Sequence, residues 1–188
     1  MENKLDRIEN ELKKFNPNLI SLKVQNKKLN KPLLLVASKT SKNKIMLFEE
    51  SMGANQIAEI SYSKNGNSMF ISSFEVNENF QQNGLGRFLF DLASAHLDLL
   101  GVTELYGEAN PTNNIKGTSN NENVTFEDEQ AKIIEIYKKL GCKFPNGDNR
   151  FTQEWESGKK IEKADATIES LAYKLAERDG FQKPKQMQ

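Results

Sequence analysis

Two glycines separated by one residue, Gly84 and Gly86, stand between an apolar segment that ends at Val76 and an amphipathic segment that begins at Leu85. Glycine at a strand-to-helix reversal lets the backbone approach a ligand closely and leaves several N–H groups without partners. The helix N-terminus adds about half a positive charge, and Arg87 in the first turn adds a full one, which favours phosphate groups. The segment is therefore a candidate phosphate site, although a tight connection without a ligand would use the same glycines.

Two nucleotide-binding folds that use glycine-rich turns fit this segment poorly. A dinucleotide-binding unit has a third glycine and belongs to an early strand, whereas this turn has two and follows several predicted strands. A nucleotide P-loop continues into Gly-Lys-Ser or Gly-Lys-Thr, and here Gly86 is followed by Arg87.

The same residues resemble the cofactor motif of the GNAT acetyltransferase superfamily. That motif is a hydrophobic strand, then Gln or Arg, two residues, Gly, one residue, and Gly or Ala; Gln81, Gly84 and Gly86 occupy these places, and Phe80 takes the commonly aromatic one. The similarity covers residues 72–100. It implies that the backbone amides of residues 82–87 hold the pyrophosphate of coenzyme A and that the main chain of residues 74–76 pairs with the pantetheine arm. The cofactor-binding residues so implied are Phe74, Val76, Gln81, Gln82, Asn83, Gly84, Leu85, Gly86, Arg87 and Asn113.

A second block, Tyr137-Lys138-Lys139-Leu140-Gly141-Cys142-Lys143-Phe144, is similar to the aromatic, three residues, Gly, aromatic ending of the same family. The resemblance implies that Tyr137 protonates the departing thiolate, for which a phenol is suited because its proton is available at neutral pH. Asn113, after a predicted strand, takes the place of a family asparagine that contacts the cofactor.

Three departures from the family pattern accompany this match. Gln82 replaces a common glycine, Cys142 replaces an aromatic residue, and residues 115–128 lengthen a connection that is ordinarily short. Tyr137 is alternatively a core aromatic residue. Glu75 is a candidate base that relays the amine proton through water, or alternatively a residue on the solvated face of its strand.

Three further residues receive structural interpretations. His96, the single histidine, falls on the apolar stripe of the helix after the glycine turn, so we assign it to packing. Direct acyl transfer needs no covalent thiol, so we interpret Cys142 as a small apolar filler. We interpret Trp155 as a core residue.

Periodicity predicts an α/β (α+β) fold with a mixed, mostly antiparallel central sheet flanked by helices, similar to that of the GNAT family, with extra helices at both ends. Asn65 and Gly66 predict a tight hairpin turn.

We expect the first 157 residues to form one acyltransferase domain and residues 158–188 to be a helical extension, polar and frayed after Gly180. The terminal helices could pack on each other, cover a sheet face or make a dimer contact. The predicted strands are residues 19–24, 33–37, 44–48, 56–63, 68–76, 102–109 and 150–155. The first three predicted helices end at Phe15, Leu100 and Leu140, the last runs from Ile161 up to Gly180, and a polar loop is predicted at 111–126.

The charge balance limits the partners. The 188 residues contain 26 basic and 26 acidic side chains, which disfavours nucleic acid and membrane surfaces as partners. One cysteine permits no intrachain disulfide and no metal-ligand cluster, which suits a reducing, cytoplasmic location. We expect no transmembrane segment and no metal.

These observations predict an N-acetyltransferase that moves an acetyl group from acetyl-CoA to a primary amine of a small molecule or protein. One alternative is an inactive CoA-binding regulatory module. Another is a structural protein that associates through its terminal helices, and a homodimer is compatible with each.

Overall fold

The computed structural model of the chain describes residues 3–38, 43–52, 56–111, 124–160 and 167–182. Its helices are α1 (Lys4–Phe15), α2 (Leu85–Leu99), α3 (Phe126–Lys139) and α4 (Ile168–Arg178), with short 3-10 turns at Glu50–Met52 and Glu78–Phe80. Its strands are β1 (Leu19–Asn26), β2 (Lys31–Ser38), β3 (Asn43–Glu49), β4 (Gln56–Asn65), β5 (Ser68–Val76), β6 (Glu104–Glu108), β7 (Arg150–Glu154) and β8 (Phe181–Gln182).

All these strands belong to one eight-stranded sheet in the order β7-β6-β5-β4-β3-β2-β1-β8. Every neighbouring pair is antiparallel except β5 and β6, which run parallel and are connected through α2. This arrangement confirms the predicted mixed, mostly antiparallel sheet. The parallel pair follows from the long crossover, because parallel neighbours cannot be joined by a hairpin.

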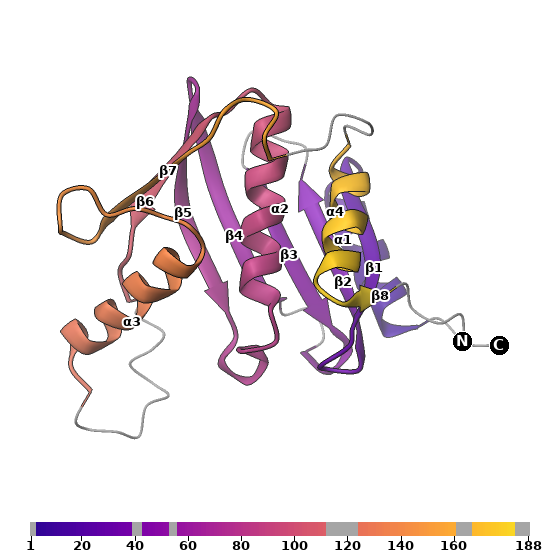
Figure 1. Cartoon of the computed structure of the whole chain (residues 1–188). Helices are drawn as coiled ribbons and strands as arrows, with labels where there is room; N and C mark the ends of the chain where they lie inside the picture. Colours follow the sequence, from indigo (N-terminus) through magenta and orange to yellow (C-terminus); the bar gives the residue numbers. More distant parts are fainter. Residues whose placement is uncertain (1–2, 39–42, 53–55, 112–123, 161–166, 183–188) are drawn as a thin grey trace.

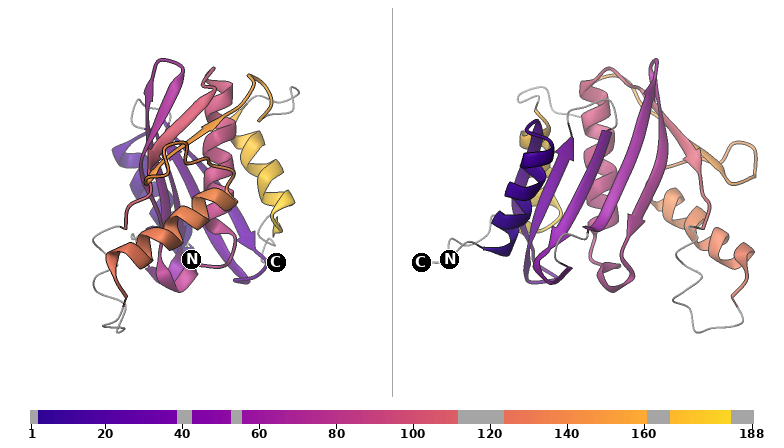
Figure 2. Two further views of the ribbon diagram at one scale, coloured as in Figure 1. Left: turned by 60° about the vertical axis from the view of Figure 1, so that its left-hand side comes forward. Right: turned by 180° about the vertical axis from the view of Figure 1, so that it is seen from behind.

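Helices cover both faces of the sheet (Figures 1 and 2). Helix α1 lies on one face, and α2 and α4 lie side by side on the other. Strand β2 shows why both faces need cover: Leu34 and Val36 pack under α1 with Leu5 and Ile8, whereas the alternate residues Leu33, Leu35 and Ala37 belong to the larger core under α2 and α4. Continuous apolar runs of this kind are typical of strands buried on both sides. Among the three arrangements considered for the terminal helices, each therefore covers a sheet face, and they do not pack on each other.

Local signals explain where several elements begin and turn. Gly66 has φ +60° in the β4–β5 hairpin, as the Asn-Gly pair predicted. Helix α3 begins after Thr125, whose hydroxyl accepts a hydrogen bond from the Asp128 amide while the Asp128 carboxylate accepts one from Thr125, a capping box.

The C-terminal segment corrects one expectation. We predicted fraying after Gly180, but residues 181–182 pair with Gln25 and Asn26 of β1 as the edge strand β8. Gly180 makes this possible, because its φ of +79° reverses the chain at the end of α4. The predicted start of the last helix near Ile161, most of the polar loop and Asn113 lie outside the described residues. In the described part of the chain, no helix is long and apolar enough to span a membrane.

Candidate functional site

The glycine turn presents a row of free amides at the N-terminus of α2. Gly84 has φ +78° and occupies the N-cap position without a side-chain cap, and the first helical hydrogen bond runs from the Phe88 amide to the Gly84 carbonyl at 3.0 Å. In the described part of the chain, the amides of residues 82–87 have no hydrogen-bond acceptor. Gly84 is exposed and a Cβ atom there would meet nothing within 4 Å, so the turn is open to a ligand. Free amides at a positive helix end form an anion site.

Two residues predicted to bind the cofactor, Gln81 and Asn83, use their side chains to brace the backbone of this turn. The Asn83 side-chain amide donates to the carbonyl oxygens of Phe80 and Gln81 at 3.2 and 3.0 Å. The Gln81 side-chain amide donates to the Val76 carbonyl at 3.1 Å. The contribution of Gln81 and Asn83 is therefore to hold the backbone that carries the amides.

Asn26, at the end of β1, also holds the turn and was missed from the sequence. Its side chain is buried, its Nδ2 donates to the Asn83 carbonyl at 3.1 Å, and its Oδ1 accepts from the Leu29 amide at 2.9 Å. A trans peptide points its C=O and N–H in opposite directions. Because the Asn83 carbonyl is drawn inward to Asn26, the Gly84 N–H points outward. No local signal could reveal this contact between residues 57 positions apart.

The first turn of α2 rests directly on β5. A Cβ atom on Gly86 would lie 3.4 Å from Phe74 Cζ and 3.6 Å from Val76 Cγ2, so Gly86 lets the helix start close to the strand. The structure thus brings together Phe74, Val76 and Gly86, as predicted. Leu85 is buried and anchors the helix start, whereas Gln82 and Arg87 are exposed around the amides.

Strand β5 has an unpaired edge beside this turn. It pairs with β6 only through Ser68, Met69 and Phe70, although it continues to Val76, and β4 occupies its other side as far as Val76. In the described structure, no strand pairs with residues 71–76 on the β6 side. Their main-chain groups can therefore pair with another extended chain, which is what the resemblance implied for the pantetheine arm.

Tyr137 lies in an aromatic cluster next to this edge. Its ring stacks on Phe151 of β7 with centroids 4.0 Å apart and an interplanar angle of 23°. The Phe74 and Phe90 centroids are 6.0 and 6.4 Å away. Gly107 of β6 makes the stack possible, because a Cβ atom there would lie 2.6 Å from Phe151 Cζ. The sequence analysis did not single out Gly107, although a glycine inside a predicted strand could have indicated this close approach.

Burial keeps the Tyr137 hydroxyl protonated. Desolvation raises the pKa of Tyr137 well above its ordinary value of 10, and the neighbouring Cys142 raises it further. No hydrogen bond to the hydroxyl occurs within the described residues. Burial also raises the pKa of the Cys142 thiol to about 12, against a small opposing effect of Lys160. Tyr137 is therefore a protonated phenol beside Phe74 that forms part of the core, and its role as an acid stays a prediction.

Glu75 lies on the opposite face of the sheet from Tyr137. Adjacent strand residues point to opposite faces, and Phe74 packs toward α2. Glu75 pairs across the strands with Glu59, which is bound to Lys44 Nζ at 2.6 Å and accepts a hydrogen bond from Ser73 at 3.0 Å. Burial opposes ionisation of Glu59, but the hydrogen bond and the charge of Lys44 outweigh it and lower its pKa. The structure therefore places Glu75 at the same unpaired edge as Tyr137, but on the other side.

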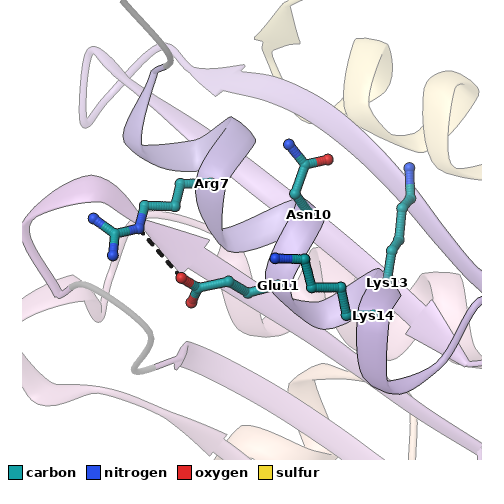
Figure 3. A pocket seen from close by; sticks show the side chains of 5 residues that line it. All are labelled: Arg7, Asn10, Glu11, Lys13 and Lys14. Atoms are coloured by element: carbon teal, nitrogen blue, oxygen red, sulfur yellow. Dashed lines mark hydrogen bonds and ion pairs between the residues drawn. The ribbon is translucent and has the colours of Figure 1, made fainter.

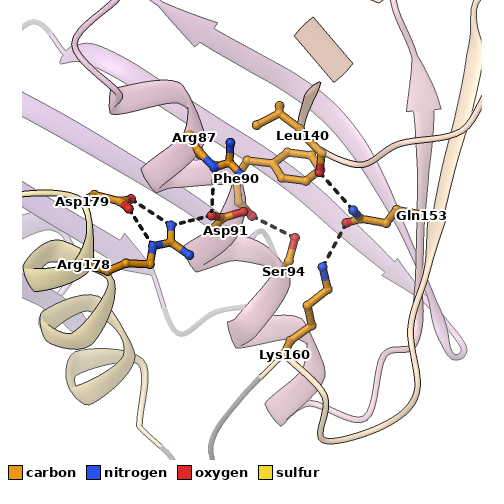
Figure 4. Close-up of polar contacts among 9 residues, drawn as sticks. All are labelled: Arg87, Phe90, Asp91, Ser94, Leu140, Gln153, Lys160, Arg178 and Asp179. Atoms are coloured by element: carbon orange, nitrogen blue, oxygen red, sulfur yellow. Dashed lines mark hydrogen bonds and ion pairs between the residues drawn. The ribbon is translucent and has the colours of Figure 1, made fainter. Parts of the chain in front are cut away.

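The remaining residues singled out in the sequence lie away from the turn. His96 Nδ1 is 3.1 Å from the Tyr62 hydroxyl, and burial lowers its pKa, in agreement with a packing role. Trp155 is half-buried with Lys160 Nζ 5.2 Å from its ring centroid. Gln153 links this region to α3, because its amide group contacts the Leu140 carbonyl and Lys160 (Figure 4).

A shallow hollow on the outward face of α1 is unrelated to this site (Figure 3). It is lined by Arg7, Asn10, Glu11, Lys13 and Lys14, and Arg7 and Glu11 are paired across it at 3.2 Å. Helix α1 and the glycine turn lie on opposite faces of the sheet. The hollow therefore contributes nothing to the candidate site.

The fold of the chain is similar to that of solved acyltransferase structures. Two variants of a cAMP-binding acyltransferase from Mycobacterium smegmatis match the chain with TM-scores of 0.55 and 0.53, each at 12% identity. Each match covers 94% of this chain but 62% and 60% of the other, so this chain spans about three fifths of their length. The PaiA N-acetyltransferase from Thermoplasma acidophilum in complex with coenzyme A matches over 60% of both chains at 13% identity, with a TM-score of 0.42. No protein-family model matches the sequence, and no curated protein matches it.

The chain thus shares its fold with an acyltransferase, and its sheet is the mixed, mostly antiparallel one that the sequence predicted. At 12% identity this likeness concerns the fold.

Proposed function

We propose that the protein is an acetyl-CoA-dependent N-acetyltransferase whose acceptor is a primary amine of a small molecule or protein. The observation that carries the proposal is the combination of the free amides of residues 82–87 with the unpaired edge of β5. The amides and Arg87 fit a pyrophosphate, and the strand edge fits the amide groups of a pantetheine arm. The fold shared with an acyltransferase, and the resemblance of the glycine turn to the GNAT cofactor motif, support this assignment.

Tyr137 and Glu75 lie on opposite sides of the β5 edge, and we assign them different steps of the reaction. On one face, Tyr137 would donate its proton to the sulfur as the C–S bond of the thioester breaks. On the other face, Glu75 would accept, through water, the proton that the amine loses as its nitrogen bonds to the acetyl carbon. Amides of residues 71–76 would hold the thioester carbonyl oxygen. Positioning of the amine against the thioester would then supply much of the rate enhancement.

A catalytically inactive CoA-binding module is the second candidate. The packing of the Tyr137 ring against Phe151 favours it, because a residue in the core can be retained for stability alone. This candidate predicts cofactor binding without turnover.

The first experiment is calorimetric titration of the protein with acetyl-CoA, compared with the variants Gly84→Glu and Gly101→Glu. Both glycines have similar positive φ values, +78° and +76°, and an open space where a Cβ would go, and they lie at the two ends of α2. Both variants should lose similar stability, about 1–2 kcal/mol, from the left-handed conformation. Only the Glu at position 84 places a carboxylate among the free amides.

Binding lost in Gly84→Glu and retained in Gly101→Glu would support the site. Absence of binding to the wild type would contradict the proposal and favour the structural alternative. Thiol release from acetyl-CoA with polyamines and lysine peptides as acceptors then separates an enzyme from a binding module.

The remaining sequence expectations belong to the same proposal. We propose a cytoplasmic location, to be checked by cell fractionation, and no metal requirement, to be checked by turnover after chelation. Light scattering of the purified chain distinguishes a monomer from a homodimer.

A further inference from the structure

Asp91 on α2 is approached by two arginines that compete for one oxygen atom (Figure 4). Arg178 of α4 donates from an Nη atom to Asp91 Oδ2 at 2.6 Å. Arg87 Nε, one turn before Asp91 on α2, lies 3.8 Å from the same oxygen. The first distance is a hydrogen bond and the second is not. Asp91 is therefore paired with Arg178.

Arg178 is itself fixed from a second side. Asp179 accepts hydrogen bonds from its Nε at 2.6 Å and from an Nη atom at 2.9 Å. These bonds, and the one to Asp91, raise the pKa of Arg178. Two carboxylates thus hold the Arg178 guanidinium in place against α2.

Arg87 is left with only a loose ion pair to Asp91, at 3.8 Å. Its side chain is 63% exposed, and within the described residues it makes no hydrogen bond. Without Arg178, Asp91 could pair with Arg87 more closely, because residues four apart share one face of a helix. Arg87 belongs to the same first turn as the free amides, so pairing it with Asp91 would remove the one full positive charge that the turn contributes.

We propose that Arg178 is a positioning residue for the phosphate site: it holds Asp91 and so leaves the Arg87 guanidinium only loosely paired and able to bind a phosphate group of the cofactor. The inference rests on the proposed coenzyme A site and assigns the C-terminal helix α4 a part in it. Arg178 acts through Asp91 and Arg87 and does not touch the cofactor.

The test is a set of coenzyme A titrations at low salt with Arg178→Gln, Arg87→Gln, the combination of both, and Arg178→Gln with Asp91→Asn. Arg178→Gln should weaken binding about two- to five-fold, the range of an exposed ion pair. The same change should have no effect in the Arg87→Gln background. Adding Asp91→Asn to Arg178→Gln should restore wild-type affinity. Arg7→Gln, on α1, controls for the loss of one positive charge elsewhere.

Two results would overturn the inference. One is wild-type affinity in Arg178→Gln, and the other is an equal loss in the Arg87→Gln background, which would indicate a general charge effect or damage to the fold.

A second readout separates this inference from the proposed function. The NMR signal of Arg87 Nε–H should shift and become protected from exchange in Arg178→Gln, because Arg87 then pairs with Asp91. An unchanged signal overturns the inference whether or not the protein binds coenzyme A. Absence of coenzyme A binding in the wild type contradicts the proposed function alone.

Discussion

Asn26 donates a hydrogen bond from its buried side chain to the backbone carbonyl of Asn83, at 3.1 Å, and so joins the first strand of the sheet to the turn before α2. The contact sets the direction of a peptide plane at the candidate phosphate site. It makes the orientation of the Gly84 amide depend on a residue that belongs to neither family motif.

Replacement of this donor should weaken both the fold and the site. In Asn26→Asp, an oxygen replaces the donating nitrogen and faces the Asn83 carbonyl, while the acceptor of the Leu29 amide is retained. We expect a loss of about 1–3 kcal/mol in the free energy of unfolding, because a buried carbonyl loses its partner. Coenzyme A affinity should fall as well. Asn79→Asp, exposed in the 3-10 turn just before the glycine turn, controls for the added negative charge; an equal loss of affinity there would contradict the orientation argument.

The glutamine that replaces a common glycine gives a second prediction. Gln82 has φ +63°, a left-handed conformation that costs non-glycine residues about 1–2 kcal/mol. Gln82→Gly should therefore leave stability unchanged or raise it by up to about 1 kcal/mol, since glycine also gains freedom in the unfolded chain. Coenzyme A affinity should not fall, because the backbone amide is the proposed contact. Gln81→Gly is the matched control and should destabilise the turn, because Gln81 has φ −66° and its side chain holds the Val76 carbonyl.

Gly107 gives a third prediction, about the support of Tyr137. The Cβ of Gly107→Ala would lie 2.6 Å from Phe151 Cζ, too close to be tolerated without a shift of the ring. We expect a destabilisation of about 1–3 kcal/mol, the usual cost of overpacking, measured by chemical denaturation. Adding Phe151→Leu should recover part of this loss if the ring is the obstacle. A loss that Phe151→Leu leaves unchanged would point to the backbone of Ile71 instead, since the Ile71 carbonyl is 3.3 Å away.

Tyr137→Phe separates the chemical role of the hydroxyl from the packing of the ring. The ring stack on Phe151 is kept, so acetyl-CoA affinity should stay near that of the wild type. If the hydroxyl is the acid, turnover should fall by about 100-fold or more. Tyr62→Phe removes another buried hydroxyl far from the glycine turn and should leave turnover unchanged. Equal turnover in Tyr137→Phe and wild type would assign Tyr137 to the core.

The buried phenols also predict how stability depends on pH. Burial raises the pKa of both Tyr62 and Tyr137 above 10, so the native state retains protons that the unfolded state releases. The free energy of unfolding should therefore be at its full value below about pH 9 and fall as the pH rises through 10. The slope should be smaller in Tyr62→Phe and in Tyr137→Phe when denaturation is measured between pH 8 and 11. A slope unchanged in both variants would contradict the assignment.

Much of this fold was predictable because its signals are local. Alternation identified strand β5 at its observed bounds, the Asn-Gly pair identified the hairpin, and the glycine pair identified the start of α2. The two short strands β6 and β8 were harder. Strand β6 was predicted too long, and β8 was not predicted, because two residues carry no periodicity and pair only when the chain has folded back on β1.

The residues of the candidate site were likewise predictable where the signal is local and were missed where the contact is long-range. Gly84, Gly86 and Phe74 were identified from spacing, and the structure brings them together. Asn26 and Arg178 were missed because their partners are 57 and 87 residues away in the chain. Glu75 lies in β5 as predicted, though next to its end, and the sequence did not reveal that it faces away from Tyr137.

The pairing of β8 with β1 has a consequence for synthesis of the protein. The glycine turn rests on Asn26 at the end of β1, and the same residue pairs with Phe181, while α4 packs against α2. Chains emerge from the ribosome N-terminal end first. The central strands can form early, but the surroundings of the turn are complete only after residues 168–182 have been made. A nascent chain should therefore form the central strands of its sheet before it completes the candidate phosphate site.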